Sequence, residues 1–472
     1  MTKRIYDELK PLFRPQSIAI IGASNTPGKW GNDMVARPLQ SSFRGAIYPI
    51  NPKAKEIEGL DAYPNLGAVS GPVDMAIITV PAPKVPDTVR DCAAKGVKAM
   101  VIISAGFAET GPEGKALQEE VVKIAKSANI RFMGPNGMGI YVSGVRLNTA
   151  FDFMPQKGGI SFISQSGTMG AFLMAVASDK GYGFNSFLSV GNQADLSMAD
   201  YIEYLGEDSN TKVIVLYIEG LKDAHRFLVN AREVVKKKPI VVYKSGLGED
   251  GARAAMSHTA SIAGSDHTFD AACHQAGIIR TYDVSHAFDI AEALSKQPLP
   301  KGNRVGIVAS GGGMCVVCAD ACNGYGLRVP ELDSATVKKL SPYLLPHAAP
   351  PKNPIDLAAD PRGMTIAEIA EELAAHSEID AIIADAPLWG ISPETVKEKL
   401  DAAEKLSLIP RKFGKPLIVL TMRRHMTGIV YELMRDRNIP FYEFPKDSAR
   451  AVYGLYMYSR LKIRNQNDNE RD

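Results

Sequence analysis

The sequence has 472 residues, which is more than one hydrophobic core usually supports and therefore predicts two or three domains. Apolar residues make up 45% and charged residues 22%, as is ordinary for a globular protein in water. The formal net charge of +2 argues against a broad nucleic-acid-binding surface, so any anion site must be local.

The location of the protein is indicated by three features of the sequence. No apolar run reaches the roughly 18 residues that a membrane span needs, and the N-terminal segment MTKRIYDELKPLF lacks the apolar centre of a secretory signal. The five cysteines are sparse and odd in number, which is typical of a reducing compartment. We therefore expect a cytoplasmic protein that contacts neither membrane nor nucleic acid.

Residues 1–145 have the pattern of a Rossmann-like α/β domain. An apolar strand at Ser17–Gly22 leads into a Gly-rich turn, and a helical pattern begins near Asn32. The strands that follow alternate with helix-sized segments, which predicts a doubly wound parallel sheet. We place these strands at Ala46–Ile50, Met75–Val80, Ala99–Ile103 and Ile130–Met133.

The ligand of this domain is not expected to be a nicotinamide nucleotide. The glycines of the turn do not spell G-x-G-x-x-G, and the second strand ends in Asn51 and Lys53 instead of an acidic residue. A lysine there suits a phosphorylated ribose, and coenzyme A (CoA) carries both that group and a pyrophosphate. The small residues of the later loops fall at the same sheet edge and leave room for such a ligand. The predicted CoA site comprises Gly22, Ser24, Gly28, Gly31, Asn51, Lys53, Val80, Pro81, Ser104, Gly106 and Asn136.

Residues 146–295 predict a second α/β domain, whose first strand we expect near Gly159–Ile163. Ser164–Thr168 then opens a helix, and Ser166, Gly167 and Thr168 at its N-terminus are the predicted phosphate-binding residues. Later strands are expected at Phe187–Val190, Val213–Ile218 and Pro239–Tyr243. The loop residues Gly191, Asn192 and Asp195 follow the strand at Phe187–Val190.

The next loop, Lys244–Ile262, carries His258 among small residues. Imidazole is a competent nucleophile toward phosphoryl groups, and Glu219 at a neighbouring strand end is placed to orient the ring. The alternatives are a histidine that caps a helix and a glutamate in a surface salt bridge.

Residues 304–464 follow a Pro-rich linker, Ser295–Asn303, and predict a third α/β domain. Cys315, Cys318 and Cys322 are spaced for one face of a helix, and we interpret them as small core residues, with no metal site. The expected strands are Val305–Ala309, Ile379–Ile383, Pro416–Leu420 and Pro440–Phe441, and Asn353–Leu357 is expected to be rich in turns.

Together these motifs resemble the α subunit of ADP-forming (NDP-forming) acyl-CoA synthetases, the acetyl-CoA synthetase group related to succinyl-CoA synthetase. The resemblance covers essentially the whole chain. It implies a CoA-binding Rossmann-like domain followed by two flavodoxin-like domains. The motifs that carry it are Lys244–Gly246, Ser257–Thr259, Gly264–Asp266, Gln275–Gly277, Gly134–Asn136, Ser164–Gly167, Gly191–Asn192 and Asn353–Leu357.

By this resemblance His258 is transiently phosphorylated, Glu219 steadies it, and Gly167 and Thr168 hold the phosphoryl group. The implied reaction converts acyl-CoA, ADP and phosphate reversibly into acid, ATP and CoA, with acetate as the expected acid. The residues Gly191, Asn192 and Asp195 are then expected to form the pocket for a small acyl group. Two departures are Ala260, where the family pattern has glycine, and His274, where a larger basic residue is expected. The sequence has no P-loop and no length left for an ATP-grasp domain, which predicts a separate β subunit that binds ADP and Mg²⁺, in an α2β2 assembly.

Three other functions are compatible with parts of the pattern. A non-catalytic CoA-binding or CoA-sensing protein of the same fold is the main alternative, although both His258 and Glu219 are present. A nicotinamide-dependent oxidoreductase is opposed by the turn and by Lys53. A protein acetyltransferase would need a further domain.

Overall fold

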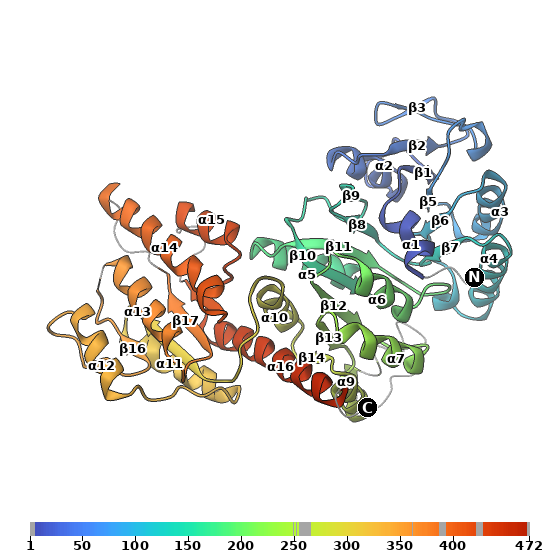
Figure 1. Cartoon of the computed structure of the whole chain (residues 1–472). Coiled ribbons are helices and arrows are strands. Elements are labelled where there is room, and N and C mark those ends of the chain that lie inside the picture. Colours follow the sequence, from blue (N-terminus) through green and yellow to red (C-terminus); the bar gives the residue numbers. More distant parts are fainter. Residues whose placement is uncertain are drawn as a thin grey trace. The chain divides into compact units, whose positions relative to one another are not determined.

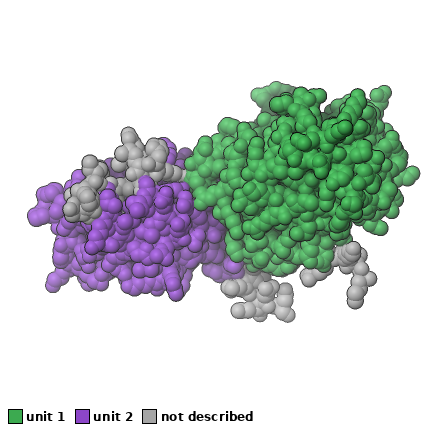
Figure 2. Space-filling model, turned by 90° about the horizontal axis from the view of Figure 1, so that it is seen from above, with its two compact units in different colours: residues 1–284 green, residues 285–472 purple. Residues whose placement is uncertain are grey.

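The computed structural model describes residues 5–248, 250–251, 253, 266–360, 362–386, 393–421 and 428–469. The chain divides into two compact units, Met1–Val284 and Ser285–Asp472, which Figure 2 colours separately. His258 and Ala260 lie outside the described residues.

The first sheet of unit 1 has five strands in the order β2-β1-β5-β6-β7, all parallel (Figure 1). β1, β5 and β6 are buried along their whole length, as expected for apolar strands covered on both faces. The strand order reverses between β1 and β5, and this opens a crevice at the carboxyl edge of the sheet. The strands are β1 (Ser17–Ile21), β2 (Ala46–Ile50), β5 (Met75–Ile78), β6 (Ala99–Ile102) and β7 (Arg131–Met133), and the helices are α1 (Ile5–Phe13), α2 (Trp30–Gln40), α3 (Val85–Lys95) and α4 (Pro112–Ser127). A two-stranded hairpin, β3 (Glu56–Ile57) and β4 (Leu60–Asp61), and three 3₁₀ turns (Leu66–Ala68, Ala82–Lys84, Ala108–Thr110) complete this part.

The second sheet of unit 1 has seven strands in the order β14-β13-β12-β10-β11-β8-β9. β10 to β14 are parallel, whereas β8 runs antiparallel to β11 and β9 antiparallel to β8. The strands are β8 (Gly139–Val142), β9 (Leu147–Asn148), β10 (Lys157–Ser164), β11 (Phe184–Ser189), β12 (Val213–Ile218), β13 (Ile240–Lys244) and β14 (Ile279–Thr281), and the helices are α5 (Gly167–Asp179), α6 (Met198–Glu207), α7 (Ala224–Val235) and α9 (Asp266–Ala276).

The start of this sheet differs from the expectation of a first strand near Gly159. β8 and β9 form a short hairpin whose turn holds Arg146 at a φ of 57°. Strands this short carry no long apolar run, so the sequence pattern misses them. The predicted boundary at residue 145 falls inside this hairpin.

One hydrophobic core joins the two sheets of unit 1. Phe13 at the end of α1 stacks on Tyr204 of α6, with ring centroids 3.9 Å apart, so the N-terminal helix packs against the second sheet's helix. Arg131 on β7 pairs with Asp195 after β11, with Nε–Oδ2 at 2.9 Å. Apolar packing and this ion pair fix the two sheets within a single unit.

Unit 2 contains one parallel sheet in the order β16-β15-β17-β18-β19, the flavodoxin-like order. Its strands are β15 (Val305–Ala309), β16 (Ile355–Asp356), β17 (Ala381–Asp385), β18 (Leu417–Leu420) and β19 (Phe441–Tyr442), and its helices are α10 (Val284–Lys296), α11 (Gly312–Gly324), α12 (Ser334–Leu340), α13 (Gly363–Ala375), α14 (Pro393–Phe413), α15 (Gly428–Asp436) and α16 (Pro445–Asn469), with a 3₁₀ turn at Ser341–Tyr343.

Helix α10 belongs to unit 2 almost entirely, although the predicted second domain runs to residue 295. Arg450 of α16 donates to the buried carboxylate of Asp289 at 2.7 Å, and the Tyr442 hydroxyl donates to the Asp289 carbonyl at 2.7 Å. The compact division therefore falls before α10, while the Pro-rich segment that suggests a linker follows it.

The three cysteines of α11 are buried, which confirms their interpretation as core residues. Burial raises the pKa of each of these thiols to about 12, because the thiolate would lose its hydration. Within the described part of the chain, no helix has the length and apolar content to cross a membrane.

Candidate functional site

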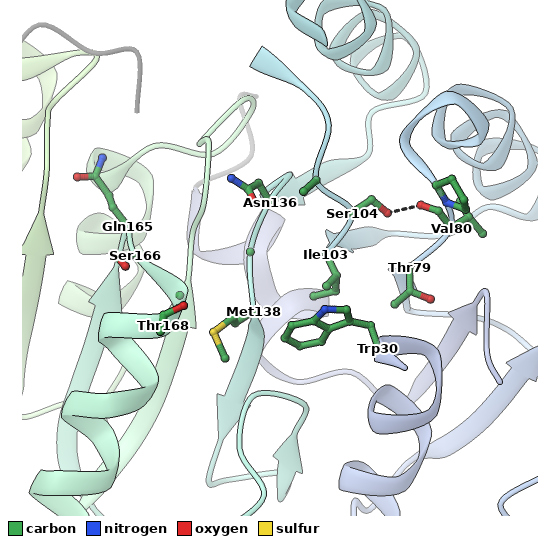
Figure 3. A pocket seen from close by; sticks show the side chains of 14 residues that line it. Trp30, Thr79, Val80, Ile103, Ser104, Asn136, Met138, Gln165, Ser166 and Thr168 are labelled. Carbon is green, nitrogen blue, oxygen red and sulfur yellow. Dashed lines mark hydrogen bonds between the residues drawn. The ribbon is translucent and has the colours of Figure 1, made fainter. Parts of the chain in front are cut away.

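A cavity of about 500 Å³, open to solvent, lies in unit 1 between loops that follow strands of both sheets (Figure 3). The loops after β5 and β6 bound one side, the turn before α5 bounds the other, and residues 136–138 run between them. Its lining residues are Trp30, Thr79, Val80, Pro81, Ile103, Ser104, Ala105, Asn136, Gly137, Met138, Gln165, Ser166, Gly167 and Thr168.

Part of the predicted CoA site and all of the predicted phosphate site meet in this cavity. The hydroxyl of Ser104 donates to the Val80 carbonyl at 2.5 Å (Figure 3). The backbone amide of Asn136 donates to the Ser104 carbonyl at 3.0 Å. These bonds tie three consecutive strand-end loops of the first sheet into one wall. The expectation that these loops share one edge agrees with this geometry.

The opposite wall is the N-terminus of α5. Ser166 is the N-cap, and its side chain accepts a hydrogen bond from the Met169 amide at 3.3 Å. A Cβ on Gly167 would lie 2.5 Å from Cγ of Met138, so only glycine allows the helix end to approach this loop. The first amides of a helix have no intrahelical partner and carry the positive end of the helix dipole, which favours an anion here.

The turn between β1 and α2 has the close approach that a phosphate-binding turn needs. Gly22 has a φ of 95°, and a Cβ on Gly31 would lie only 2.0 Å from the Gly22 carbonyl oxygen. The Ser24 amide donates to the Gly31 carbonyl at 3.2 Å. Of the residues around this turn, Trp30 at the start of α2 lines the cavity.

At the end of β2, the side chain of Asn51 forms hydrogen bonds to other residues of the protein. It donates to the Ala23 carbonyl at 2.7 Å and accepts from the Lys53 amide at 2.8 Å. Asn51 therefore shapes the β1–α2 turn, while the Lys53 side chain is exposed to solvent. Seven predicted CoA residues do not line the 500 Å³ cavity: Gly22, Ser24, Gly28, Gly31, Asn51, Lys53 and Gly106.

A smaller cavity of about 70 Å³ brings together Glu219 and the loop after β11. Glu219 directly follows β12 and is 7% exposed, which does not fit the alternative of a surface salt bridge. The residues around the cavity are Ala108, Glu109, Asn136, Gln165, Gly191, Asn192, Gln193, Glu219, Gly220 and Lys222.

Asn192 is the centre of a polar network in this smaller cavity. Its side-chain amide donates to Glu109 at 2.5 Å and to Gln118 at 3.0 Å, and its backbone amide donates to the Pro135 carbonyl at 2.9 Å. Its side-chain oxygen accepts from Asn136 at 3.4 Å. Asn192 thus joins the loops of the two sheets.

Two charged groups flank this network. Burial acts to raise the pKa of Glu109, but hydrogen bonds from Asn192, Gly106 and Phe107 outweigh it and hold the pKa below its ordinary value. Partial desolvation lowers the pKa of Lys222, whose ammonium donates to the Asn192 carbonyl at 2.5 Å.

Asp195 is placed differently from the other predicted acyl-pocket residues. Its carboxylate accepts from Arg131 at 2.9 Å and from the Phe132 amide at 2.9 Å, with its side chain 6% exposed. It lines neither cavity. The sequence shows an acid after a strand but not the arginine on β7 that it faces.

The lining residues to which the sequence reasoning gave no role include Trp30, Glu109, Gln165 and Lys222. An aromatic residue beside a Gly-rich turn and a glutamine inside a Ser-Gln-Ser-Gly turn are local signals for Trp30 and Gln165. Glu109 lies in the 3₁₀ turn between β6 and α4, and Lys222 lies in the loop between β12 and α7. No local pattern marks either residue, so only the fold reveals them.

Two family models match unit 1, and the second match also includes most of α10. The CoA binding domain matches residues 16–143, and the succinyl-CoA ligase-like flavodoxin domain matches residues 157–294. Each match contains one wall of the 500 Å³ cavity. The fold class predicted from the sequence is thereby confirmed.

Relatives with established names match nearly the whole chain. The α subunit of acetate–CoA ligase [ADP-forming] II from Pyrococcus furiosus is 41% identical, over 95% of this chain and 97% of the relative. The α subunit of ligase I from the same organism is 37% identical, over 97% of this chain and 99% of the relative. The acetate–CoA ligase [ADP-forming] of Methanocaldococcus jannaschii is 38% identical, over 98% of this chain but only 65% of its own length.

A solved structure agrees with these relatives. The acetyl-coenzyme A synthetase 1 of Candidatus Korarchaeum cryptofilum, described as dinucleotide forming and solved with phosphate and ADP, superposes with a TM-score of 0.86 and 33% identity, covering 98% of each chain. The family expected from the motifs and its enzyme class, a ligase, are confirmed. The chain therefore belongs to the family of ADP-forming acetate–CoA ligase α subunits, within the succinyl-CoA synthetase superfamily.

Proposed function

We propose that this chain is the α subunit of an ADP-forming acid–CoA ligase that interconverts acyl-CoA, ADP and phosphate with acid, ATP and CoA. The observation that carries the proposal is the 500 Å³ cavity, where loops of the CoA-binding fold face the N-terminus of α5. A thioester bound at the first wall would meet a phosphate bound at the second.

In the first chemical step, a phosphate oxygen attacks the thioester carbonyl carbon and the carbon–sulfur bond breaks. The products are an acyl phosphate and CoA thiolate, which takes up a proton. Ser166, Gly167 and Thr168 hold the phosphate through backbone amides at the helix end. Holding both reactants in one cavity supplies much of the rate enhancement.

In the second step, a ring nitrogen of His258 attacks phosphorus, the phosphorus–oxygen bond to the acyl group breaks, and the carboxylate leaves. Glu219 is buried at the cavity that also contains Asn192 and Gln165, where its carboxylate orients the imidazole and stabilises the phosphorylated form. Transfer of the phosphoryl group from His258 to ADP then produces ATP.

The nucleotide site belongs to a partner in this proposal. The Methanocaldococcus ligase carries about a further third of its length beyond the match, which leaves room for a nucleotide-binding part in that protein. The P. furiosus relatives are named as α subunits, which also supports a partner. We propose an ATP-grasp β subunit that holds ADP with Mg²⁺, in an α2β2 assembly located in the cytoplasm.

The proposed acid is small, with acetate as the first candidate. The cavity beside Gly191 and Asn192 has a volume of only about 70 Å³, and polar groups line it. Asp195 contributes by holding the base of this loop through Arg131. If bulky acyl-CoA substrates gave a higher kcat/KM than acetyl-CoA, the small-acid assignment would be wrong.

The test is product formation by the complex that co-purifies with this chain. With acetyl-CoA, Mg²⁺ and ADP, we expect phosphate-dependent formation of ATP, acetate and free CoA in equal amounts. His258→Ala should abolish ATP formation, whereas His347→Ala, which changes an exposed histidine of unit 2, should leave it intact. CoA binding without ATP formation in the intact complex would favour the non-catalytic alternative.

A further inference from the structure

Gln165 makes three hydrogen bonds to one turn at the end of a neighbouring strand. Its side-chain oxygen accepts from the backbone amides of both Glu219 and Gly220, the latter at 3.0 Å. Its side-chain nitrogen donates to the Gly220 carbonyl at 2.7 Å. Both the oxygen and the nitrogen of the side-chain amide therefore hydrogen-bond to the turn that carries Glu219.

The sheet topology explains why these bonds come from a side chain. β10 and β12 pair in parallel as far as Ser164 and Tyr217, and the backbone amide of Gln165 then donates to the Tyr217 carbonyl at 3.2 Å. Beyond this point the two chains diverge, because β10 leads to α5 and β12 leads to α7. The side chain of Gln165 extends the pairing across the divergence.

Gln165 is also continuous with the phosphate-binding turn. It immediately precedes Ser166, the N-cap of α5, and it lines both the 500 Å³ and the 70 Å³ cavity. A shift of the Glu219 turn must therefore be accompanied by a shift of this residue or by loss of its bonds.

We propose that Gln165 is a positioning residue, which locks the Glu219 carboxylate at a fixed place relative to the phosphate-binding turn before α5. The inference rests on the proposed function, in which Glu219 orients His258. Gln165 acts through Glu219 and takes no part in bond making. A glutamine is required because one amide supplies both the acceptor for two N–H groups and the donor for one carbonyl.

Gln165→Met keeps the length of the side chain and removes all three bonds. In the complex with its partner, we expect the rate of His258 phosphorylation by acetyl phosphate, the step in which Glu219 acts, to fall about 10- to 100-fold, as a misplacement of about 1 Å produces. The KM for CoA should change little, because the CoA wall is untouched. Gln165→Glu keeps the oxygen that accepts from both backbone amides but turns a second oxygen toward the Gly220 carbonyl, so it serves if the Met variant does not fold, and a loss of phosphorylation rate is again expected.

A double-mutant cycle with Glu219→Gln distinguishes a role of Gln165 in positioning Glu219 from a general stabilising role of its hydrogen bonds. If Gln165 acts through Glu219, Gln165→Met should slow phosphorylation by less than about threefold once Glu219 is already changed. Equal losses in both backgrounds would overturn the inference and leave the proposed function standing. A normal rate in Glu219→Gln alone would remove the proposed role of Glu219 and the inference with it.

Gln297 provides a matched control. In unit 2 its side chain accepts from the Leu417 amide at 2.9 Å and donates to the Asn438 carbonyl at 2.7 Å, the same type of clamp. Gln297→Met should lower the unfolding temperature without slowing phosphorylation. Equal slowing in this variant would show that any lost clamp has this effect, and would overturn the inference.

Discussion

The close contact between Gly191 and the loop after β7 predicts that a substitution at Gly191 destabilises the protein. Gly191 has a φ of 50°, and a Cβ added there would lie 2.2 Å from the Pro135 carbonyl oxygen and 2.5 Å from the Asn136 oxygen. Both neighbours are backbone atoms, so no side-chain rotation relieves the clash. Gly191→Ala should force apart the loops that line the smaller cavity.

The expected loss of folding stability in Gly191→Ala has two contributions. Placing alanine in the left-handed region costs about 1–2 kcal/mol, and overpacking costs about 1–3 kcal/mol. The sum, about 2–5 kcal/mol, corresponds to a fall in unfolding temperature of roughly 5–15 °C for a unit of this size. The Asn192–Pro135 hydrogen bond would be strained as well, so ATP formation should also fall.

Gly96→Ala is the control for the cost of placing alanine in the left-handed backbone region. Gly96 has a similar φ of 76°, ends α3, and has no atom within 4 Å of an added Cβ. Calorimetry of the two variants should show a larger loss in Gly191→Ala, by about 1–3 kcal/mol of packing strain. Equal losses with full activity would show that the two loops do not pack this closely in solution.

Three further predictions concern charge and burial. The depressed pKa of Glu109, against an ordinary value of 4.5, stabilises the fold above that pH, and this contribution is lost as the pH falls through the folded-state pKa. Glu109→Gln should therefore flatten the acid side of the stability–pH curve, and an unchanged curve would contradict the Asn192 bond. All five cysteines are buried, so a thiol reagent near pH 8 should modify them only after denaturation, and rapid modification of the native protein would contradict their burial. Arg450→Leu should destabilise unit 2 by about 3–5 kcal/mol, because it leaves the Asp289 carboxylate buried without this partner, and a calorimetric loss below about 1 kcal/mol would refute that.

The regular parts of the fold were predictable because their signals are local. Continuous apolar runs gave β2, β12 and β15 with the bounds that the structure has. The β8–β9 hairpin was missed because its strands are two to four residues long and lie at a sheet edge. The place of α10 in unit 2 depends on the distant partner Arg450, which no local pattern indicates.

The candidate site was predictable only as far as topology decides it. Parallel strands bring their carboxyl ends to one edge, which was enough to group Ser104 with Asn136 at the first sheet and Ser166 with Glu219 at the second, but not to bring the two groups into one cavity. The other positions depend on interactions between residues far apart in the sequence. Asp195 forms an ion pair with Arg131, and Gln165 hydrogen-bonds to the turn that carries Glu219.

The central claim is that this chain carries the phosphoryl group on His258. The most direct measurement is to incubate the co-purified complex with γ-labelled ATP and Mg²⁺ and to follow label on this chain in the wild type and in His258→Ala. We predict label that is stable in alkali and lost in acid, as for phosphohistidine, and absent from the variant. Equal label in both proteins, or none in the wild type with a functional nucleotide-binding partner, would contradict the claim.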